Sequence, residues 1–208
     1  ELVDRATRLG VSEDSFEGDE VRMDVGDDDH AHIARLNAAT RSVGTAPVTE
    51  TGVVARAYLS TSPEQTAAIG ARLAKSLRAG DVLLLRGELG SGKTCFTQGL
   101  ARGLDVADPV KSSSFILVAE YGGRLRLYHA DLYRLTTPEE VAELALGDYT
   151  IDGVLVVEWP ERGLRELPDE RLEIDFEHAG VSERRLSFTA AGERYRHLLQ
   201  AAEEAASS

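Results

Sequence analysis

The sequence has almost no cysteine, and this scarcity limits where the protein can work. Cys95 is the only cysteine among 208 residues, so the chain cannot form a disulfide bond within itself. Proteins without disulfide bonds are typical of reducing compartments, so we expect a cytoplasmic location. The sequence also lacks any apolar run approaching the roughly 20 residues of a membrane-spanning helix, so we expect no role in a membrane.

Positive charge is also scarce. The formal net charge is −13, and lysine occurs only at Lys75, Lys93 and Lys111. Proteins that bind nucleic acid unaided use clustered lysine and arginine side chains to displace the counterions of the phosphates. Any role near RNA is therefore expected to be indirect, through a partner protein that holds the RNA.

The first quarter of the chain differs in composition from the rest. Residues 1–50 carry 12 acidic and 5 basic side chains, a net charge of −7, and few large apolar side chains. Such a segment buries too little apolar surface to offset the entropy lost on ordering, so we expect a poorly ordered acidic extension. The Asp and His run at residues 27–32 permits a metal site, but a solvated tail fits the composition better. We expect residues 51–208 to form the compact domain.

A glycine-rich segment at residues 87–94 carries the strongest functional signal. It reads Gly-Glu-Leu-Gly-Ser-Gly-Lys-Thr, follows an apolar run at residues 81–86 and precedes a plausible helix at residues 95–102. This is the pattern and context of a phosphate-binding loop, whose backbone amides and helix N-terminus attract phosphate. Lys93 adds a full charge near the β- and γ-phosphates, and the Thr94 hydroxyl can ligate Mg²⁺. The sequence therefore predicts a nucleoside triphosphate site.

Strands and helices alternate along the domain. The segments Ser62–Gln65 and Thr137–Glu140 each predict a helix start, the first with Gln65 closing a capping box. Further patterns predict a hairpin around residues 122–123, a central strand at Val154–Val157, late strands at 172–176 and 185–189, and a terminal helix at 193–204. Led by a phosphate loop, this alternation predicts a three-layer α/β domain with a central, mostly parallel sheet.

Two carboxylates at strand ends are candidates for the rest of the site. Glu158 directly follows the strand at Val154–Val157, where a magnesium-binding or water-orienting carboxylate is expected, and Asp131 follows an earlier strand. Ligands of open α/β sheets bind at the carboxyl ends of the strands, which favours catalysis over loop capping for both. Ser112 lies in a segment suited to sensing a γ-phosphate. Trp159 is either a packed side chain or a wall of the nucleotide site, and His129 is either packed or a proton carrier.

Four strings together make a resemblance recognisable. The phosphate loop at residues 87–94 is followed by Val110-Lys111-Ser112 with Phe115, by His129-Ala130-Asp131-Leu132-Tyr133-Arg134-Leu135, and by Val157-Glu158-Trp159-Pro160. In this order they closely resemble the bacterial TsaE (YjeE) family of ATPases, which are needed to make threonylcarbamoyladenosine in tRNA. The resemblance covers about residues 56–200. Where the family usually has Ser-Pro-Thr, this chain has Ser112-Ser113-Ser114, and the lost proline removes a constraint on φ. Cys95 replaces a common second threonine.

The resemblance implies an ATPase that acts on the threonylcarbamoyl transferase subunits TsaD and TsaB, and through them on tRNA. It implies that Thr94 and Glu158 hold Mg²⁺ and that Asp131 assists the attacking water. With Lys93, Asp131 and Glu158 as the catalytic residues, the expected ATP-binding residues are Glu88, Leu89, Gly90, Ser91, Gly92, Lys93, Thr94, Cys95, Thr61, Thr66, Ser112 and Trp159.

Two other functions share the phosphate loop. A small-molecule kinase needs an acceptor pocket and an arginine-bearing lid, for which Arg162 and Arg165 are candidates. A nucleotide-gated interaction module needs binding alone, without turnover. We favour an ATP hydrolase that works slowly by itself, because the sequence contains no clear arginine finger.

Overall fold

The computed structural model describes residues 54–111 and 116–207. The expected acidic extension, its run at residues 27–32 and Ser112 lie outside these ranges. Within the described residues, no helix is long and apolar enough to cross a membrane.

Seven strands form one mixed sheet in the order β1-β7-β6-β2-β5-β4-β3. Neighbours among β6, β2, β5 and β4 are parallel, whereas β7 and β3 run antiparallel to their neighbours. Five strands thus run in one direction, which confirms the mostly parallel sheet. The strands are β1 Val54–Ser60, β2 Val82–Gly87, β3 Val118–Tyr121, β4 Arg126–Asp131, β5 Gly153–Glu158, β6 Arg171–His178 and β7 Arg184–Ala191.

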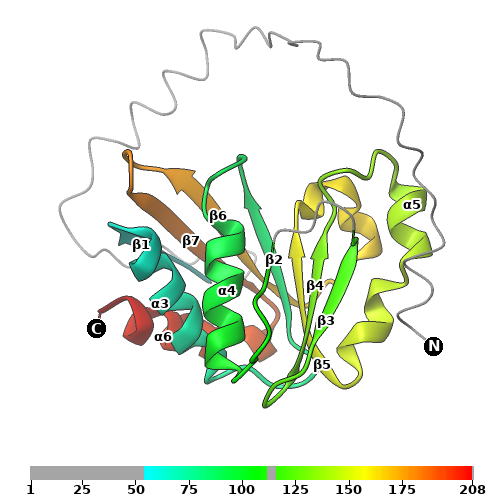
Figure 1. The fold of residues 1–208 in the computed structure, drawn as a ribbon, viewed down its shortest axis with the longest axis horizontal. Coiled ribbons are helices and arrows are strands. Elements are labelled where there is room, and N and C mark those ends of the chain that lie inside the picture. The colour runs from blue at the N-terminus through cyan, green and yellow to red at the C-terminus, as the bar shows by residue number, and fades with distance from the viewer. Residues whose placement is uncertain (1–53, 112–115, 208) are drawn as a thin grey trace, which may run out of the picture. The chain divides into compact units, whose positions relative to one another are not determined.

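Helices cover both faces of the sheet and make three layers (Figure 1). Leu83 and Leu85, on one face of β2, belong to the main apolar core together with buried residues of α3, α4 and α6. The opposite face packs against shorter elements, as the contact between Tyr128 of β4 and Tyr149 shows. The longer helices are α3 Pro63–Ala74, α4 Lys93–Gly103 and α6 Arg196–Ser207; α5 Pro138–Glu143 and the 3-10 helices Leu146–Thr150, Pro160–Arg162, Leu164–Glu166 and Glu193–Tyr195 are shorter.

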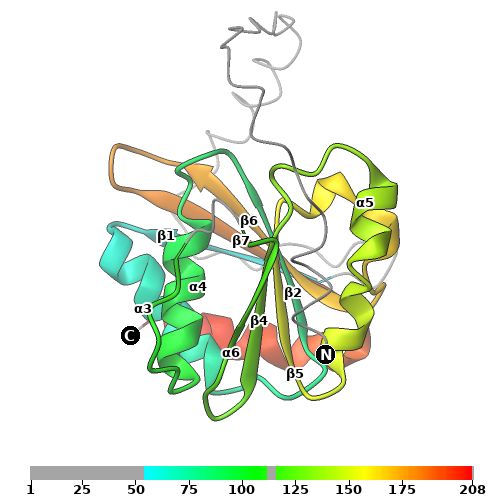
Figure 2. The same ribbon diagram turned by 45° about the vertical axis from the view of Figure 1, so that its right-hand side comes forward.

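Helices α3 and α4 lie side by side because glycine lines their contact (Figure 2). A Cβ atom on Gly99 would lie 2.0 Å from the Ala67 carbonyl oxygen, and one on Gly103 would lie 2.1 Å from the Ala71 carbonyl oxygen. Neither gap admits a side chain, so the backbones approach as closely as helices can. This packing brings the start of α3 beside the phosphate loop that precedes α4.

Capping side chains begin the helices at the expected places, with one correction. Ser62 caps α3 by accepting a hydrogen bond from the Gln65 amide at 3.2 Å. Gln65 does not complete a capping box, because its Oε1 accepts from the amide of Thr61 at 2.6 Å and not from that of the N-cap residue Ser62. At α5 the full box forms between Thr137 and Glu140.

A cluster of buried polar groups holds the start of β2. This is the opposite end of the strand from the phosphate loop. Asp81 is 1% exposed; it accepts from the Arg78 amide at 2.8 Å and pairs with the Arg194 Nε at 3.0 Å. The next amide, of Val82, donates to the Tyr195 hydroxyl at 2.9 Å. The C-terminal segment is thereby tied to the central strand.

Candidate nucleotide site

The phosphate loop connects β2 to α4, and its glycines have backbone dihedral angles that other residues rarely adopt. Gly87 has φ +139° and Gly92 has φ +105°, both in the left-handed region that favours glycine. A Cβ on Gly87 would also lie 2.5 Å from the Phe176 carbonyl oxygen. Because Gly92 is the residue before α4, the loop runs directly into the N-terminus of that helix. The unpaired amides there supply partial positive charge.

Lys93 lies inside the loop and is 4% exposed. Its ammonium donates to the carbonyl oxygens of Gly87 at 2.5 Å and Glu88 at 2.8 Å, and lies 4.0 Å from the centre of the Trp159 ring. Burial lowers the pKa of Lys93, and the nearby carboxylates, Glu158 foremost, act in the opposite direction. The loop therefore holds a desolvated positive charge.

Glu158 ends β5 and is 2% exposed. One carboxylate oxygen lies 2.9 Å from His129 Nε2, and the other accepts from the Thr94 hydroxyl at 3.2 Å. The two sequence-predicted magnesium ligands, Thr94 and Glu158, are thus in contact although 64 residues separate them. His129 is buried against Glu158, so it lies beside the predicted site rather than in an unrelated part of the core.

Asp131 lies next to Glu158 because β4 and β5 are parallel and pair these residues in register. It is half-buried, and one carboxylate oxygen accepts from the Tyr133 amide at 3.2 Å. Burial raises the pKa of Asp131, and the charge of Glu158 acts in the same direction, against the lowering effect of the Tyr133 amide. Two carboxylates therefore face the phosphate loop from adjacent strand ends.

Trp159 has φ +59° and ψ +47°, an uncommon conformation for a bulky residue. Its amide donates to the Leu85 carbonyl at 3.2 Å, and its ring packs on Tyr133 with centroids 4.8 Å apart. The conformation turns the chain sharply after Glu158 and holds the indole beside Lys93. Left-handed backbone at a non-glycine residue is often found at functional sites.

These residues line a cavity of about 230 Å³. Most of the predicted site residues meet there, together with Tyr133, which the sequence prediction did not include. The lining consists of Leu89, Gly90, Ser91, Gly92, Lys93, Thr94, Cys95, Asp131, Tyr133, Glu158 and Trp159.

Three predicted ATP-binding residues in the described ranges lie outside this lining. Glu88 is exposed, and its carbonyl oxygen accepts from Lys93. Thr61 is exposed and hydrogen-bonded to Gln65, and Thr66 is buried, with its hydroxyl 2.7 Å from that of Ser60. Thr66 is nevertheless close to the loop, because a Cβ on Gly92 would lie 3.8 Å from its methyl group.

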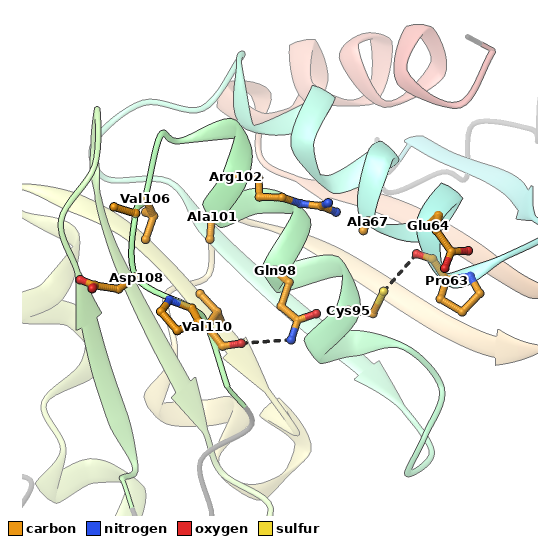
Figure 3. A pocket seen from close by; sticks show the side chains of 12 residues that line it. Pro63, Glu64, Ala67, Cys95, Gln98, Ala101, Arg102, Val106, Asp108 and Val110 are labelled. Carbon is orange, nitrogen blue, oxygen red and sulfur yellow. Dashed lines mark hydrogen bonds between the residues drawn. The ribbon is translucent and has the colours of Figure 1, made fainter.

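A second cavity, of about 510 Å³, shares a lining residue with the first, and Figure 3 shows the side chains that line it. It lies between the start of α3, helix α4 and the loop at residues 106–110, and Cys95 lines both cavities. The Cys95 thiol donates to the Pro63 carbonyl at 3.1 Å, and burial raises its pKa, so the thiol keeps its proton. Gln98 donates to the Val110 carbonyl at 3.0 Å across the groove.

The oxygen atoms around Thr94 suit magnesium. Mg²⁺ binds oxygen ligands at about 2.1 Å in octahedral geometry, which places adjacent ligand oxygens about 3 Å apart. The Thr94 hydroxyl and the Glu158 carboxylate are 3.2 Å apart, close to that spacing. The described residues contain no cluster of three or more His, Cys, Asp or Glu side chains with the arrangement of a metal site. A magnesium ion here would therefore depend on the hydroxyl, one carboxylate and oxygens of the bound nucleotide or water.

Arg184 is a further neighbour of the loop that sequence reasoning missed. Its guanidinium donates to the carbonyl oxygens of Gly90 at 3.2 Å and Ser91 at 3.1 Å, across more than 90 residues of sequence. No local sequence pattern distinguishes Arg184 from the other arginines of the chain, so its contact with the loop could not be predicted. Tyr133 carried a weak signal, since it lies two residues after Asp131.

Comparisons by family model, by sequence and by structure each find proteins similar to this chain. The family model described as "Threonylcarbamoyl adenosine biosynthesis protein TsaE" matches residues 60–186. A Bacillus subtilis protein named "tRNA threonylcarbamoyladenosine biosynthesis protein TsaE" is 43% identical over 145 residues, 69% of this chain and 90% of that protein. The protein of the same name from Treponema pallidum is 42% identical over 112 residues, 53% of this chain and 83% of its own length. The crystal structure of YdiB from Bacillus subtilis is similar with a TM-score of 0.62 at 38% identity, covering 73% of this chain and 96% of that one.

Proposed function

Since the chain belongs to the TsaE family of threonylcarbamoyl adenosine biosynthesis proteins, we propose that it hydrolyses ATP to support threonylcarbamoyladenosine modification of tRNA. The observation that carries the ATPase proposal is the meeting of Lys93, Thr94, Asp131 and Glu158 at one cavity. Asp131 and Glu158 end the parallel neighbours β4 and β5, and Lys93 and Thr94 begin α4, the helix that follows β2, the other parallel neighbour of β5.

Each of the four side chains has a role in this proposal. Lys93 binds the β- and γ-phosphates with its buried ammonium, exchanging the loop carbonyls for phosphate oxygens. Asp131 orients the attacking water from the adjacent strand end, and its raised pKa suits it to accepting a proton. Thr94 and Glu158 hold Mg²⁺, which when bound neutralises charge that develops on the phosphates.

His129 supports Glu158 in the same proposal. Its ring nitrogen lies 2.9 Å from one carboxylate oxygen, which leaves the other oxygen toward Thr94. A hydrogen bond from a buried neighbour fixes the orientation of a metal-binding carboxylate. This contact supports a positioning role for His129 in the proposal, in preference to proton transfer.

The nucleoside half of ATP extends toward the larger groove in this proposal. Cys95 lies at the junction of the two cavities, and the groove beyond it begins at Pro63 and Glu64 (Figure 3). These two residues belong to the segment from Thr61 to Thr66 that the family resemblance places near the adenine. The Thr61 hydroxyl bonds the Gln65 side chain and the Thr66 hydroxyl lies 2.7 Å from that of Ser60, and the approach of both residues to the base stays part of this proposal.

We further propose that the protein is cytoplasmic and acts on the subunits TsaD and TsaB, reaching tRNA only through them. The net charge of −13 supports an indirect contact with RNA. Lys93 is the one cationic side chain among the described residues that line the cavity. Arg162 and Arg165, the candidates for a kinase lid, are not in that lining, so the geometry does not favour the kinase alternative.

Phosphate release from ATP, measured with and without the two partner subunits and tRNA, tests the proposal. We expect slow release alone and an acceleration of about 10³-fold or more with partners, the scale of a missing arginine supplied in trans. Phosphate transferred to a metabolite instead of water would support the kinase. Binding without multiple turnovers in the presence of partners would support the interaction module.

A further inference from the structure

Arg184 donates hydrogen bonds to two separate segments of the chain. It is half-buried at the start of β7, and its guanidinium reaches two carbonyl oxygens of the phosphate loop, those of Gly90 and Ser91. Its Nη1, which has two hydrogens, donates to the Glu183 carbonyl in the turn between β6 and β7 at 2.8 Å and also lies within hydrogen-bond distance of those of Gly180 at 3.2 Å and Val181 at 3.4 Å. One planar side chain thus joins the β6–β7 turn to the tip of the phosphate loop.

The contacts of Arg184 with the two loop carbonyls also fix the direction of the amides that follow them. In a trans peptide the carbonyl and the following amide point in opposite directions. When the Ser91 carbonyl points to Arg184, the Gly92 amide must point away from it, toward the cavity that Gly92 lines. When the Gly90 carbonyl points to Arg184, the Ser91 amide is turned toward the Glu88 carbonyl, which it meets at 3.2 Å to close the loop's turn.

Packing adds to the hydrogen bonds. A Cβ on Gly92 would lie 4.0 Å from Cγ of Arg184, so the aliphatic stem of Arg184 lies in contact distance of the loop backbone. Left-handed glycines make this backbone intrinsically free, as the φ of +74° at Gly90 illustrates. A loop built from glycine needs an external contact to stay in one conformation, and Arg184 supplies it.

We propose that Arg184 is a positioning residue that clamps the phosphate loop in its phosphate-binding conformation without touching the nucleotide. This inference rests on the proposed function, in which the loop binds ATP. The clamp lowers the entropy lost on binding, because it holds the loop in one conformation before ATP binds. Arginine is required, since its rigid fork offers five donors, whereas lysine offers three donors on one flexible atom and cannot span the two backbones.

The test compares Arg184→Lys and Arg184→Ala with a matched control, Arg185→Ala. Arg185 is the adjacent residue of β7, so the control removes the same charge from nearly the same place. Hydrogen exchange of the amides at residues 88–92 is measured without nucleotide, and binding of a non-hydrolysable ATP analogue is measured by calorimetry. We expect both Arg184 variants to exchange faster and bind about tenfold more weakly, and Arg185→Ala to behave as the unmodified protein.

Each outcome either supports the clamp or overturns it. Arg184→Lys with unmodified exchange and affinity would overturn the clamp and leave only a charge effect. Faster exchange throughout the domain in Arg184→Ala would show general destabilisation, in which case Arg184→Lys, which keeps the stem and the charge, decides. If the unmodified protein binds no ATP analogue, the proposed function fails, while loop-specific exchange still supports or overturns the clamp.

Discussion

The two ends of the central strands β2 and β5 each bury a carboxylate, but they surround it differently. Asp81, before β2, is paired with the Arg194 guanidinium and accepts a backbone amide. Glu158, at the end of β5, is met by a threonine hydroxyl and a histidine ring, and no arginine or lysine of the described chain lies within ion-pair distance of it. Both are at most 2% exposed.

This difference separates a structural carboxylate from one available for chemistry. A buried charge that is paired and hydrogen-bonded fixes the chain, as Asp81 does between Arg78 and the C-terminal segment. A buried carboxylate that meets a hydroxyl and a histidine ring, with no arginine or lysine paired to it, can instead be completed by a cation. In the proposed function this cation is Mg²⁺, held between the Glu158 carboxylate and the Thr94 hydroxyl and near the Lys93 ammonium.

Removing either carboxylate of the site should have the largest effect. Glu158→Gln and Asp131→Asn keep the shape of the side chain but remove the charge that holds metal or orients water. We expect phosphate release to fall by about 10²-fold or more, with ATP affinity within about tenfold of the original. Single-turnover phosphate release and calorimetry measure the two quantities. Release at the original rate would remove the variant residue from the proposed mechanism.

Lys93→Ala should have the next largest effect, on binding. The substitution removes a charge-assisted contact with phosphate worth about 1.5–3 kcal/mol, so ATP affinity should fall by about 10- to 150-fold. The side chain contacts loop carbonyls and little of the core, so thermal unfolding should change only slightly. Calorimetric titration with an ATP analogue provides the measurement, and Lys75→Ala, on the far end of α3, is a matched control. An unchanged affinity would contradict the assignment of the phosphate loop.

Asp81→Asn sharpens the comparison between the two ends. It weakens a buried pair whose arginine side chain is 43% exposed, so we expect the free energy of unfolding to fall by about 1–2 kcal/mol while ATP affinity stays unchanged. Glu158→Gln should instead lose phosphate release while its free energy of unfolding stays unchanged. Denaturant unfolding of both variants tests this pair of expectations. Equal losses of stability would mean that both carboxylates are structural.

Deleting residues 1–50 should have the smallest effect, because the segment is acidic, poor in large apolar side chains and outside every motif of the site. We expect phosphate release and the melting temperature to stay close to those of the full chain. Differential scanning calorimetry compares the two proteins. A large drop in melting temperature would show that the segment contributes to the folded domain.

Sequence reasoning worked best where local pattern carries the signal. Phosphate loops need glycine at fixed positions, and apolar runs followed by Asp131 and Glu158 mark strand ends that the parallel sheet then places side by side. The first strand, Val54–Ser60, was not predicted, because an antiparallel edge strand beside β7 alternates weakly and depends on its partner.

The missed contacts share one physical cause. Arg184 reaches Gly90 across 94 residues of sequence, and the ring of Tyr133 meets Trp159 only after two strands have paired. Gln65 shows the same limit on a smaller scale, since its sequence spacing fits a capping box but the turn of the chain offers it the Thr61 amide. Spacing along the chain indicates which groups are available, whereas tertiary packing decides which of them meet.

The left-handed turn at Trp159 also has an optical consequence. Trp159 is the only tryptophan of the chain, and its indole lies between the Tyr133 ring and the Lys93 ammonium. Indole emission depends on nearby charge and on contact with other rings, so displacement of the ammonium by a ligand would change the intensity or wavelength of the emitted light. All indole emission comes from a residue that lines the cavity, so the intrinsic fluorescence of the unlabelled protein reports on that site.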